Sequence, residues 1–308
     1  MNTMYITHHA GYLHEMGVLH PDNPKRIDAI SDQLIMSGIM SYIVSYHSFS
    51  RASDKDILRV HTLEYLNYLR SLVPKKGSYC YIDMDTIMNS YTLDAAFYAA
   101  GAGLFAIDSV FGKNFNNAFC ATRPPGHHAC HNRAMGSCFF NNIAIAARYA
   151  ISKYKLKRLA IIDFDVHHGN GTEEIFADDP SVLMCSFFQH PFYPDTRLIH
   201  SQNMCNIPVD AYVDGAFIRD IVNRKWVPAI ESFRPELILI SAGFDAHRED
   251  DMGQLNLHES DYKWITDILV EMSEKYSSSR IVSFLEGGYD MSSLGRSAVL
   301  HIRSLAKL

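Results

Sequence analysis

The sequence predicts one α/β domain with a mainly parallel central β-sheet and helices on both faces. Short apolar runs that suit buried strands alternate with longer stretches that favour helices, over all 308 residues. No internal repeat, low-complexity tract or linker interrupts this alternation. Polar residues capable of chemistry gather directly after the apolar runs, and parallel sheets bind ligands at that edge.

Composition narrows the class of protein. Hydrophobic residues make up 47% of the chain and charged residues 20%, which is typical of a water-soluble globular protein. No apolar run approaches the ~18–20 residues that a membrane span needs, and the chain does not begin like a secretory signal, so we expect no membrane association and a cytoplasmic location. The net charge of −6, with dispersed basic residues, argues against nucleic acid and mildly favours neutral or cationic ligands. The six cysteines lack CxxC spacing and predict neither disulfides nor a cysteine zinc site.

The first half of the chain is expected to supply strands at 4–7, 41–46 and 118–121 and helices at 25–36, 54–59, 61–72 and 92–111. Asn23-Pro24 is a good helix start, and the stretch 92–111 is rich in alanine, the best helix former. Two loops stand out. The loop 81–90 carries Asp83 and Asp85 and is a candidate rim of a cleft, whereas the loop 123–142 is long enough without structure of its own to indicate function.

The second half continues the alternation. The run Leu159-Ala160-Ile161-Ile162 suits a strand buried on both faces. Further strands are expected at 182–187, 236–241 and 280–285, helices at 142–154, 172–178, 214–232, 259–276 and 291–308, and a polar loop at 188–203.

The end of the strand that starts at Leu159 carries the strongest chemical signal. Side chains two apart along an extended chain share a face, so Asp163, Asp165 and His167 should lie on one side. A single Asp-x-His could merely turn the chain toward solvent, with carboxylates bonded to backbone amides. Three other strand ends supply complementary groups, however: Gly126-His127-His128, Asp245, and Glu286-Gly287-Gly288-Tyr289.

Three of these residues predict a metal site. Asp165, His167 and Asp245 would form an oxygen-rich set of three ligands that leaves positions open for water and substrate, and open positions imply catalysis. Zn²⁺ is the first choice for such ligands, and Fe²⁺, Co²⁺ and Mn²⁺ also fit.

Five motifs then carry a resemblance to a known family. They are RPPGHHA at 123–129, GSCFFNN at 136–142, IIDFDVHHGNGT at 161–172, SAGFDAH at 241–247 and EGGY at 286–289. In this order they resemble the histone deacetylase superfamily, which has the arginase/deacetylase fold, over nearly the whole chain. Asn170 and the HPDNPKR segment at 20–26 look more like the class II branch and its bacterial relatives.

The resemblance implies a single deacetylase domain over 1–308 and a role for each matching residue. A metal-activated water would attack the acetamide carbonyl, with His128 as general base and later general acid, and His127 as its electrostatic partner. Asp163 would orient His127 and keep it cationic, whereas Asn170 would orient His128 without adding charge. Tyr289 would polarise the carbonyl and stabilise the oxyanion.

Other implied roles concern the substrate. Gly136 would line the substrate tunnel, Tyr193 would supply one aromatic wall, and Asp85 or Asp83 would grip the substrate backbone at the rim. Ser137 stands where the family commonly has Phe, so the tunnel is expected to be wider or more polar. Met252 stands where a polyamine-selective relative is expected to have Glu, which disfavours acetylpolyamines.

The resemblance also implies structural K⁺. One site would lie near Asp163, Asp165, His167, Ser186 and Phe187, and a second near Phe176, Asp179 and Val182.

The expected activity is zinc-dependent removal of the acetyl group from N-ε-acetyl-lysine of a protein or peptide. Two alternatives keep the enzyme: a deacylase of a small acylated amine such as an acetylpolyamine, or a deacylase of longer acyl-lysines. A third is a non-catalytic module that binds acyl-lysine. The sequence leaves the oligomeric state open.

Overall fold

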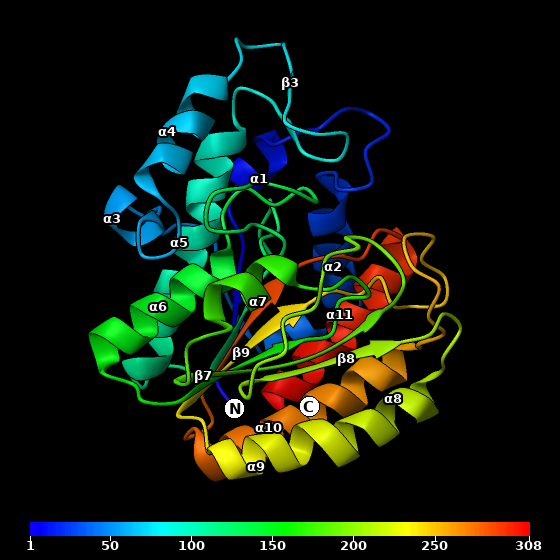
Figure 1. Ribbon diagram of the computed structural model, residues 1–308. Coiled ribbons are helices and arrows are strands. Elements are labelled where there is room, and N and C mark those ends of the chain that lie inside the picture. Colours follow the sequence, from blue (N-terminus) through cyan, green and yellow to red (C-terminus); the bar gives the residue numbers. More distant parts are fainter.

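The computed structural model describes all 308 residues, and its centre is an eight-stranded sheet (Figure 1). The strand order is β2-β1-β5-β10-β9-β6-β7-β8, and every neighbouring pair runs parallel. The strands are β1 (Thr3–Ile6), β2 (Val44–Tyr46), β5 (Asn117–Cys120), β6 (Leu159–Asp163), β7 (Val182–Gln189), β8 (Met204–Val209), β9 (Leu237–Ala242) and β10 (Ile281–Leu285). A separate antiparallel pair joins β3 (Cys80–Tyr81) to β4 (Ile87–Met88).

Helices cover both faces of the sheet, so its strands are apolar on both sides. Figure 1 shows α3 to α6 gathered on one side and α2 and α8 to α11 on the other. Strand residues alternate between the two resulting cores: Leu159 and Ile161 pack into one, Ala160 and Ile162 into the other. The helices are α1 (Ala10–Leu13), α2 (Lys25–Met36), α3 (Asp54–Ile57), α4 (Leu63–Leu72), α5 (Thr92–Phe111), α6 (Asn142–Tyr154), α7 (Asn170–Phe176), α8 (Gly215–Ile221), α9 (Val227–Phe233), α10 (Glu259–Tyr276) and α11 (Met291–Ala306).

Most expected elements are confirmed, and four helices, α2, α5, α6 and α10, have the predicted bounds. The strand expected at 41–46 is shorter, because a 3₁₀ turn at Ile39–Ser41 precedes β2. The helix expected at 214–232 is continuous but contains a π-helical segment, Val222–Trp226, just before Pro228. Pro228 has no N–H to donate to the preceding turn, which explains the wider turn there.

The helix α5 is long and apolar enough to cross a membrane by length and composition alone. In this fold, 61% of its most apolar window is buried, with Phe284 of β10 pressed against Gly103. The burial explains its composition, because a helix surrounded by other parts of the protein is apolar on most of its surface, as a membrane helix is.

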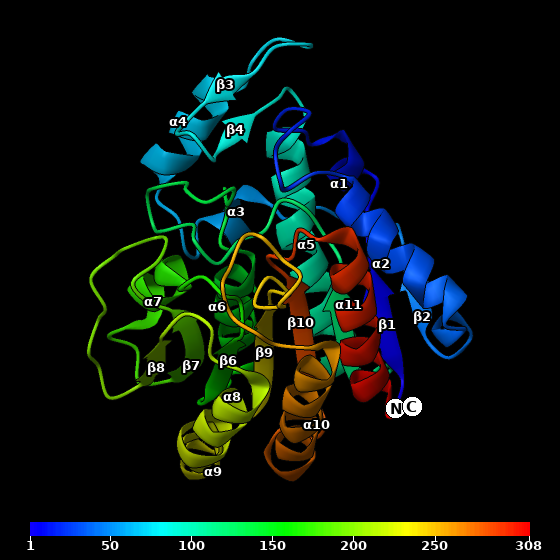
Figure 2. The same cartoon turned by 90° about the vertical axis from the view of Figure 1, so that its right-hand side faces the viewer.

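The two ends of the chain meet. The amino group of Met1 lies 3.2 Å from the carbonyl oxygen of Ala306, and Figure 2 shows the N and C labels side by side. Because β1 starts at this edge and α11 returns to it from the end of β10, both ends lie opposite the carboxyl ends of the strands.

Candidate metal centre and active site

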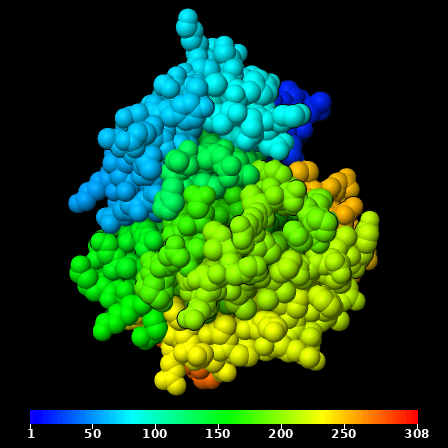
Figure 3. Space-filling model, viewed as in Figure 1, coloured from blue at the N-terminus to red at the C-terminus, as the bar shows by residue number.

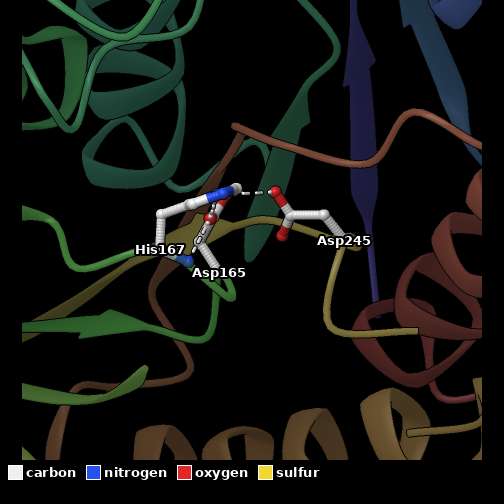
Figure 4. Close-up of side chains that lie close together, drawn as sticks. All are labelled: Asp165, His167 and Asp245. Carbon is white, nitrogen blue, oxygen red and sulfur yellow. Dashed lines mark hydrogen bonds and ion pairs between the residues drawn. The ribbon is translucent and has the colours of Figure 1, made fainter. Parts of the chain in front are cut away.

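The metal-ligand candidates lie at the carboxyl ends of two adjacent strands, β6 and β9 (Figure 4). Asp165 and His167 follow β6, and Asp245 follows β9. The Nδ1 atom of His167 is 3.0 Å from Oδ1 of Asp165 and 3.1 Å from Oδ2 of Asp245. One potential ligand atom from each residue lies within 4.8 Å of the others, and all three side chains are buried.

These donors fit a divalent metal ion. Oδ2 of Asp245 is buried, and its contact with Nδ1 of His167 at 3.1 Å lacks hydrogen-bond geometry, so this charged oxygen would be costly to bury without a further partner. Burial lowers the pKa of His167, but the close carboxylates of Asp165 and Asp245 outweigh it and raise the pKa to about 10. The cluster therefore attracts positive charge, and its mixed oxygen and nitrogen ligands suit Zn²⁺ or Fe²⁺.

Backbone groups hold the two carboxylates in place. Oδ2 of Asp165 accepts a hydrogen bond from the Gly287 amide at 2.8 Å, and Oδ1 of Asp245 accepts one from the Val166 amide at 3.0 Å. The approach requires glycine, since a Cβ on Gly287 would lie 2.0 Å from Oδ2 of Asp245. A Cβ on Gly243 would lie equally close, at 2.0 Å, to Oδ2 of Asp165.

His127 sits in an acidic, buried setting. Its Nδ1 atom is 2.9 Å from Oδ2 of Asp163, and its Nε2 atom is 3.8 Å from Oδ2 of Asp165. Burial lowers the pKa of His127, but the charges of Asp163, Asp165 and Glu286 outweigh it and hold the pKa well above its ordinary value. The imidazole is therefore cationic in this arrangement.

His128 lies beside it with the opposite electrostatics. The two ring centroids are 4.0 Å apart, and Nδ1 of His128 is 2.8 Å from Oδ1 of Asn170. Burial lowers the pKa of His128, and the positive charges of His127 and His167 lower it further. Because the amide oxygen can only accept, Nδ1 carries the hydrogen and Nε2 keeps a free lone pair.

Tyr289 faces the same pocket from the loop after β10. The guanidinium of Arg26 lies 4.8 Å from its ring centroid, and Gly288, at φ +112°, makes the turn before it. The buried carboxylate of Asp250 accepts hydrogen bonds from the amides of Tyr289 and Asp290, at 2.6 and 3.0 Å. Burial raises the pKa of Tyr289 well above its ordinary value, so its hydroxyl stays protonated and able to donate.

A cavity of about 250 Å³ joins these groups to the surface. All five expected substrate-binding residues line it. Phe192, to which we assigned no role from the sequence, lines it as well and stacks on His167 with ring centroids 5.5 Å apart. The lining residues are His20, Pro21, Asp85, His128, Gly136, Ser137, His167, Phe192, Tyr193, Asp251, Met252 and Tyr289.

Asp85 and Asp83, the two alternatives for the rim aspartate, have different positions in the structure. Asp85 lines the cavity, whereas the carboxylate of Asp83 accepts the Asp85 amide at 2.9 Å and shapes the turn. The Asp85 carbonyl accepts hydrogen bonds from Oγ of Ser137 at 3.0 Å and from Nε2 of His20 at 3.1 Å. Ser137 therefore ties the rim loop to the cavity wall.

The two expected K⁺ sites differ. Asp163 and Ser186 are register partners on β6 and β7, so the residues of the first site do lie together. At the second site, the carbonyl oxygens of Phe176, Asp179 and Val182 already accept hydrogen bonds from the side-chain amide of Asn203. The second group of residues does not fit a K⁺ ion.

Sequence reasoning missed the residues that support the catalytic candidates from behind. Oε2 of Glu286 accepts the amides of Gly126 and His127, at 2.7 and 3.1 Å, and its other oxygen accepts the Ser241 hydroxyl. Arg26 donates to the carbonyls of Gly288 and Glu286. Two features of the sequence could have indicated these roles. Arg26 is a charged residue on an expected helix, and Glu286 stands at a strand end before Gly287 and Gly288.

Comparisons with known proteins agree with this geometry. The histone deacetylase domain family matches residues 20–305. A probable deacetylase from Archaeoglobus fulgidus is 37% identical over 296 residues, which cover 93% of this chain and 81% of the relative. The histone deacetylase-like amidohydrolase of Pseudomonas aeruginosa is 33% identical over 284 residues, covering 88% of this chain and 72% of the relative.

A solved structure gives the same answer for the fold. The crystal structure of the HDA15 HD domain matches with a TM-score of 0.92 and 31% identity, over 99% of this chain and 88% of that one. The arginase/deacetylase fold expected from the motifs is thereby confirmed. With this domain match, these relatives and this fold, the chain belongs to the histone deacetylase family of deacetylases and amidohydrolases.

Proposed function

We propose that residues 1–308 form a single deacetylase domain that hydrolyses the acetamide of N-ε-acetyl-lysine in a protein or peptide, with Zn²⁺ as the first-choice metal. The observation that carries this proposal is the pairing of a neutral histidine with a cationic one beside three buried metal-ligand candidates. A metal held by Asp165, His167 and Asp245 would supply a polarised water and a Lewis acid. Fe²⁺ is the alternative metal, and a cytoplasmic location stays a prediction.

The protein's own residues have distinct tasks in this proposal. His128 takes a proton through Nε2 as water attacks the acetyl carbon, and Asn170 keeps that nitrogen free. The Tyr289 hydroxyl donates to the developing oxyanion, and the fixed positive charge of His127 stabilises it further. When the C–N bond breaks, His128 returns the proton to the lysine nitrogen, and acetate and amine leave.

Surface features around the cavity favour a peptide or protein substrate over a small amine. Val18 and Leu19 are 99% and 95% exposed beside His20, and Met84 is 92% exposed beside Asp85. Figure 3 shows the cyan part of the chain, which includes β3 and β4, at one end of the molecule. Apolar side chains exposed together mark interaction surfaces, and a polypeptide that flanks the acetyl-lysine would cover these.

A second candidate is hydrolysis of longer acyl-lysines or of a small acylated amine. It draws support from Ser137, a small side chain on the cavity wall that Tyr193 and Phe192 also line. Relative turnover of acetyl-lysine peptides, longer acyl-lysine peptides and acetylated polyamines separates these substrates.

The decisive experiment is deacetylation of a fluorogenic acetyl-lysine peptide by the purified protein. We expect activity that a chelator abolishes and that added Zn²⁺ or Fe²⁺ restores. Tyr289→Phe should bind metal normally but lose roughly 10²–10³ in kcat, as expected for a missing oxyanion donor. Full activity in Tyr289→Phe, or activity insensitive to chelation, would contradict the mechanism. Bound metal with no turnover of any acylated amine would favour a non-catalytic module that binds acyl-lysine.

A further inference from the structure

Three backbone carbonyl oxygens converge where α7 ends and the chain turns into β7. They belong to Phe176, Asp179 and Val182, and the Nδ2 atom of Asn203 lies 2.8, 3.0 and 2.9 Å from them. We call this group of three oxygens the carbonyl cage. Such oxygens carry partial negative charge, most of all at a helix C-terminus, and rings of carbonyls can replace the water around K⁺. In this chain they surround an amide nitrogen.

The orientation of the Asn203 amide is fixed by its other end. Oδ1 of Asn203 accepts a hydrogen bond from the Ser201 hydroxyl at 2.6 Å. Turning the amide over would aim Oδ1 at three other acceptors and lose every bond in the cage. The backbone is also anchored, because the Asn203 carbonyl accepts the Met184 amide of β7 at 2.9 Å.

Other side chains already balance the remaining charge at this helix end. The carboxylate of Asp179 is paired with Arg148 and also accepts the amide and hydroxyl of Ser181. The Arg148 guanidinium lies 4.6 Å from the Phe176 ring centroid and donates to the Ile175 carbonyl. The Asp179 carboxylate is therefore already paired and adds no free charge to the cage.

We propose that the Asn203 amide takes the place of a monovalent cation in the carbonyl cage, so that this part of the fold is closed without K⁺. The same helix begins at Asn170, which holds His128, so the amide fixes the far end of an element that positions a catalytic candidate. The inference concerns the fold and does not depend on the proposed reaction.

The test replaces K⁺ by Tl⁺, whose anomalous scattering locates it directly in crystals. We expect no Tl⁺ in the cage of the wild-type protein and one Tl⁺ there in Asn203→Ala, which exposes the three oxygens. Gln202→Ala is the matched control, because Gln202 is an exposed neighbour and the side chain that donates to the three oxygens is that of Asn203. It should behave as the wild type.

A second readout uses thermal unfolding in KCl and in LiCl. A cation that binds only the folded state raises Tm with its concentration, so Asn203→Ala should gain a larger K⁺-dependent rise than wild type or Gln202→Ala. A K⁺ ion at Asp163 and Ser186 would raise the Tm of all three proteins equally. The test therefore compares the K⁺-dependent rise in Tm between the variants.

Two results would overturn the proposal. One is Tl⁺ density between the three carbonyl oxygens of the wild-type protein, which needs no variant to observe. The other is an Asn203→Ala protein that takes up no ion in the cage and shows the K⁺ response of the wild type.

Discussion

Ser137 illustrates how one side chain can set both the width and the rigidity of the cavity. It is 6% exposed, has a φ of +65°, and donates to the Asp85 carbonyl while its amide donates to Thr86. A larger residue at this position would fill part of the cavity that Tyr193 also lines. A smaller residue would leave the cavity width unchanged but would lose the hydrogen bond to the Asp85 carbonyl.

Ser137→Phe should therefore narrow the cavity and change the substrate preference. We expect kcat/KM for longer acyl-lysine peptides, relative to acetyl-lysine peptide, to fall by roughly 10-fold or more, the size of effect that steric fit produces. Ser137→Ala keeps the cavity width and should keep the wild-type ratio. An unchanged ratio in Ser137→Phe would show that residue 137 does not limit the acyl group.

Gly287→Ala should weaken metal binding, because its Cβ would lie 2.0 Å from one ligand oxygen and 2.7 Å from another. We expect affinity for Zn²⁺ to fall about 10–100-fold, as for other disturbed ligand supports. Competition with a chelator measures this. Gly112→Ala, at the end of α5, is the control and should bind Zn²⁺ as the wild type does; equal affinity in all three proteins would refute the crowding argument.

At the scale of elements, His301 joins three of them. This buried residue of α11 hydrogen-bonds through Nδ1 to Thr266 of α10 at 2.7 Å and through Nε2 to Ser283 of β10 at 2.8 Å. Burial lowers its pKa from 6.5 to about 3. Between pH 6.5 and about 3, His301 is therefore neutral in the folded protein and protonated in the unfolded chain.

The free energy of unfolding should therefore decrease as pH falls from 6.5 toward 3. His301→Gln cannot titrate, so its slope over this window should be smaller by up to about 1.4 kcal/mol per pH unit. Urea unfolding at several pH values measures both slopes. His14, whose pKa burial and Arg123 lower to about 3, adds to the slope of both proteins. Identical slopes would mean that His301 is protonated in the folded state.

Elements with strong local signals could be predicted from sequence, and weakly patterned ones could not. The helix α5 was predictable because its helix propensity agrees with its burial, and α10 also begins with a capping box. The edge strand β8 was missed, because its residues are half-buried and include Pro208. The two-residue strands β3 and β4 and the one-turn helix α1 are too short for any periodicity.

For the site, sequence order along the strands carried most of the information. Parallel strands end at one edge, so residues after β5, β6, β9 and β10 were expected to meet, and the structure brings them together. Phe192 was missed because packing, rather than chemistry at a strand end, gives it its place. Glu286 stands at a strand end, but the sequence does not show that its carboxylate accepts hydrogen bonds from the amides of Gly126 and His127. Asn203 was missed because a polar residue in a loop resembles many others.

At the scale of the whole molecule, the active-site cavity and the two chain ends lie on opposite sides of the sheet. The cavity opens at the carboxyl edge of the sheet, and Met1 and Ala306 meet at the other edge. The exposed segment at 75–79 lies in the α4–β3 connection, and none of its residues belongs to either core.

Because the two ends lie close together, a short linker can join them, and new ends can be made in an exposed loop. A circular permutant, with a short linker across the old ends and new ends between Lys76 and Gly77, should fold and keep wild-type Zn²⁺ affinity. Circular dichroism and metal titration check this, and a permutant that fails to fold would mean that assembly requires the original order of synthesis. The same arrangement lets either end be tethered to a surface or a second protein while the cavity faces away from the attachment.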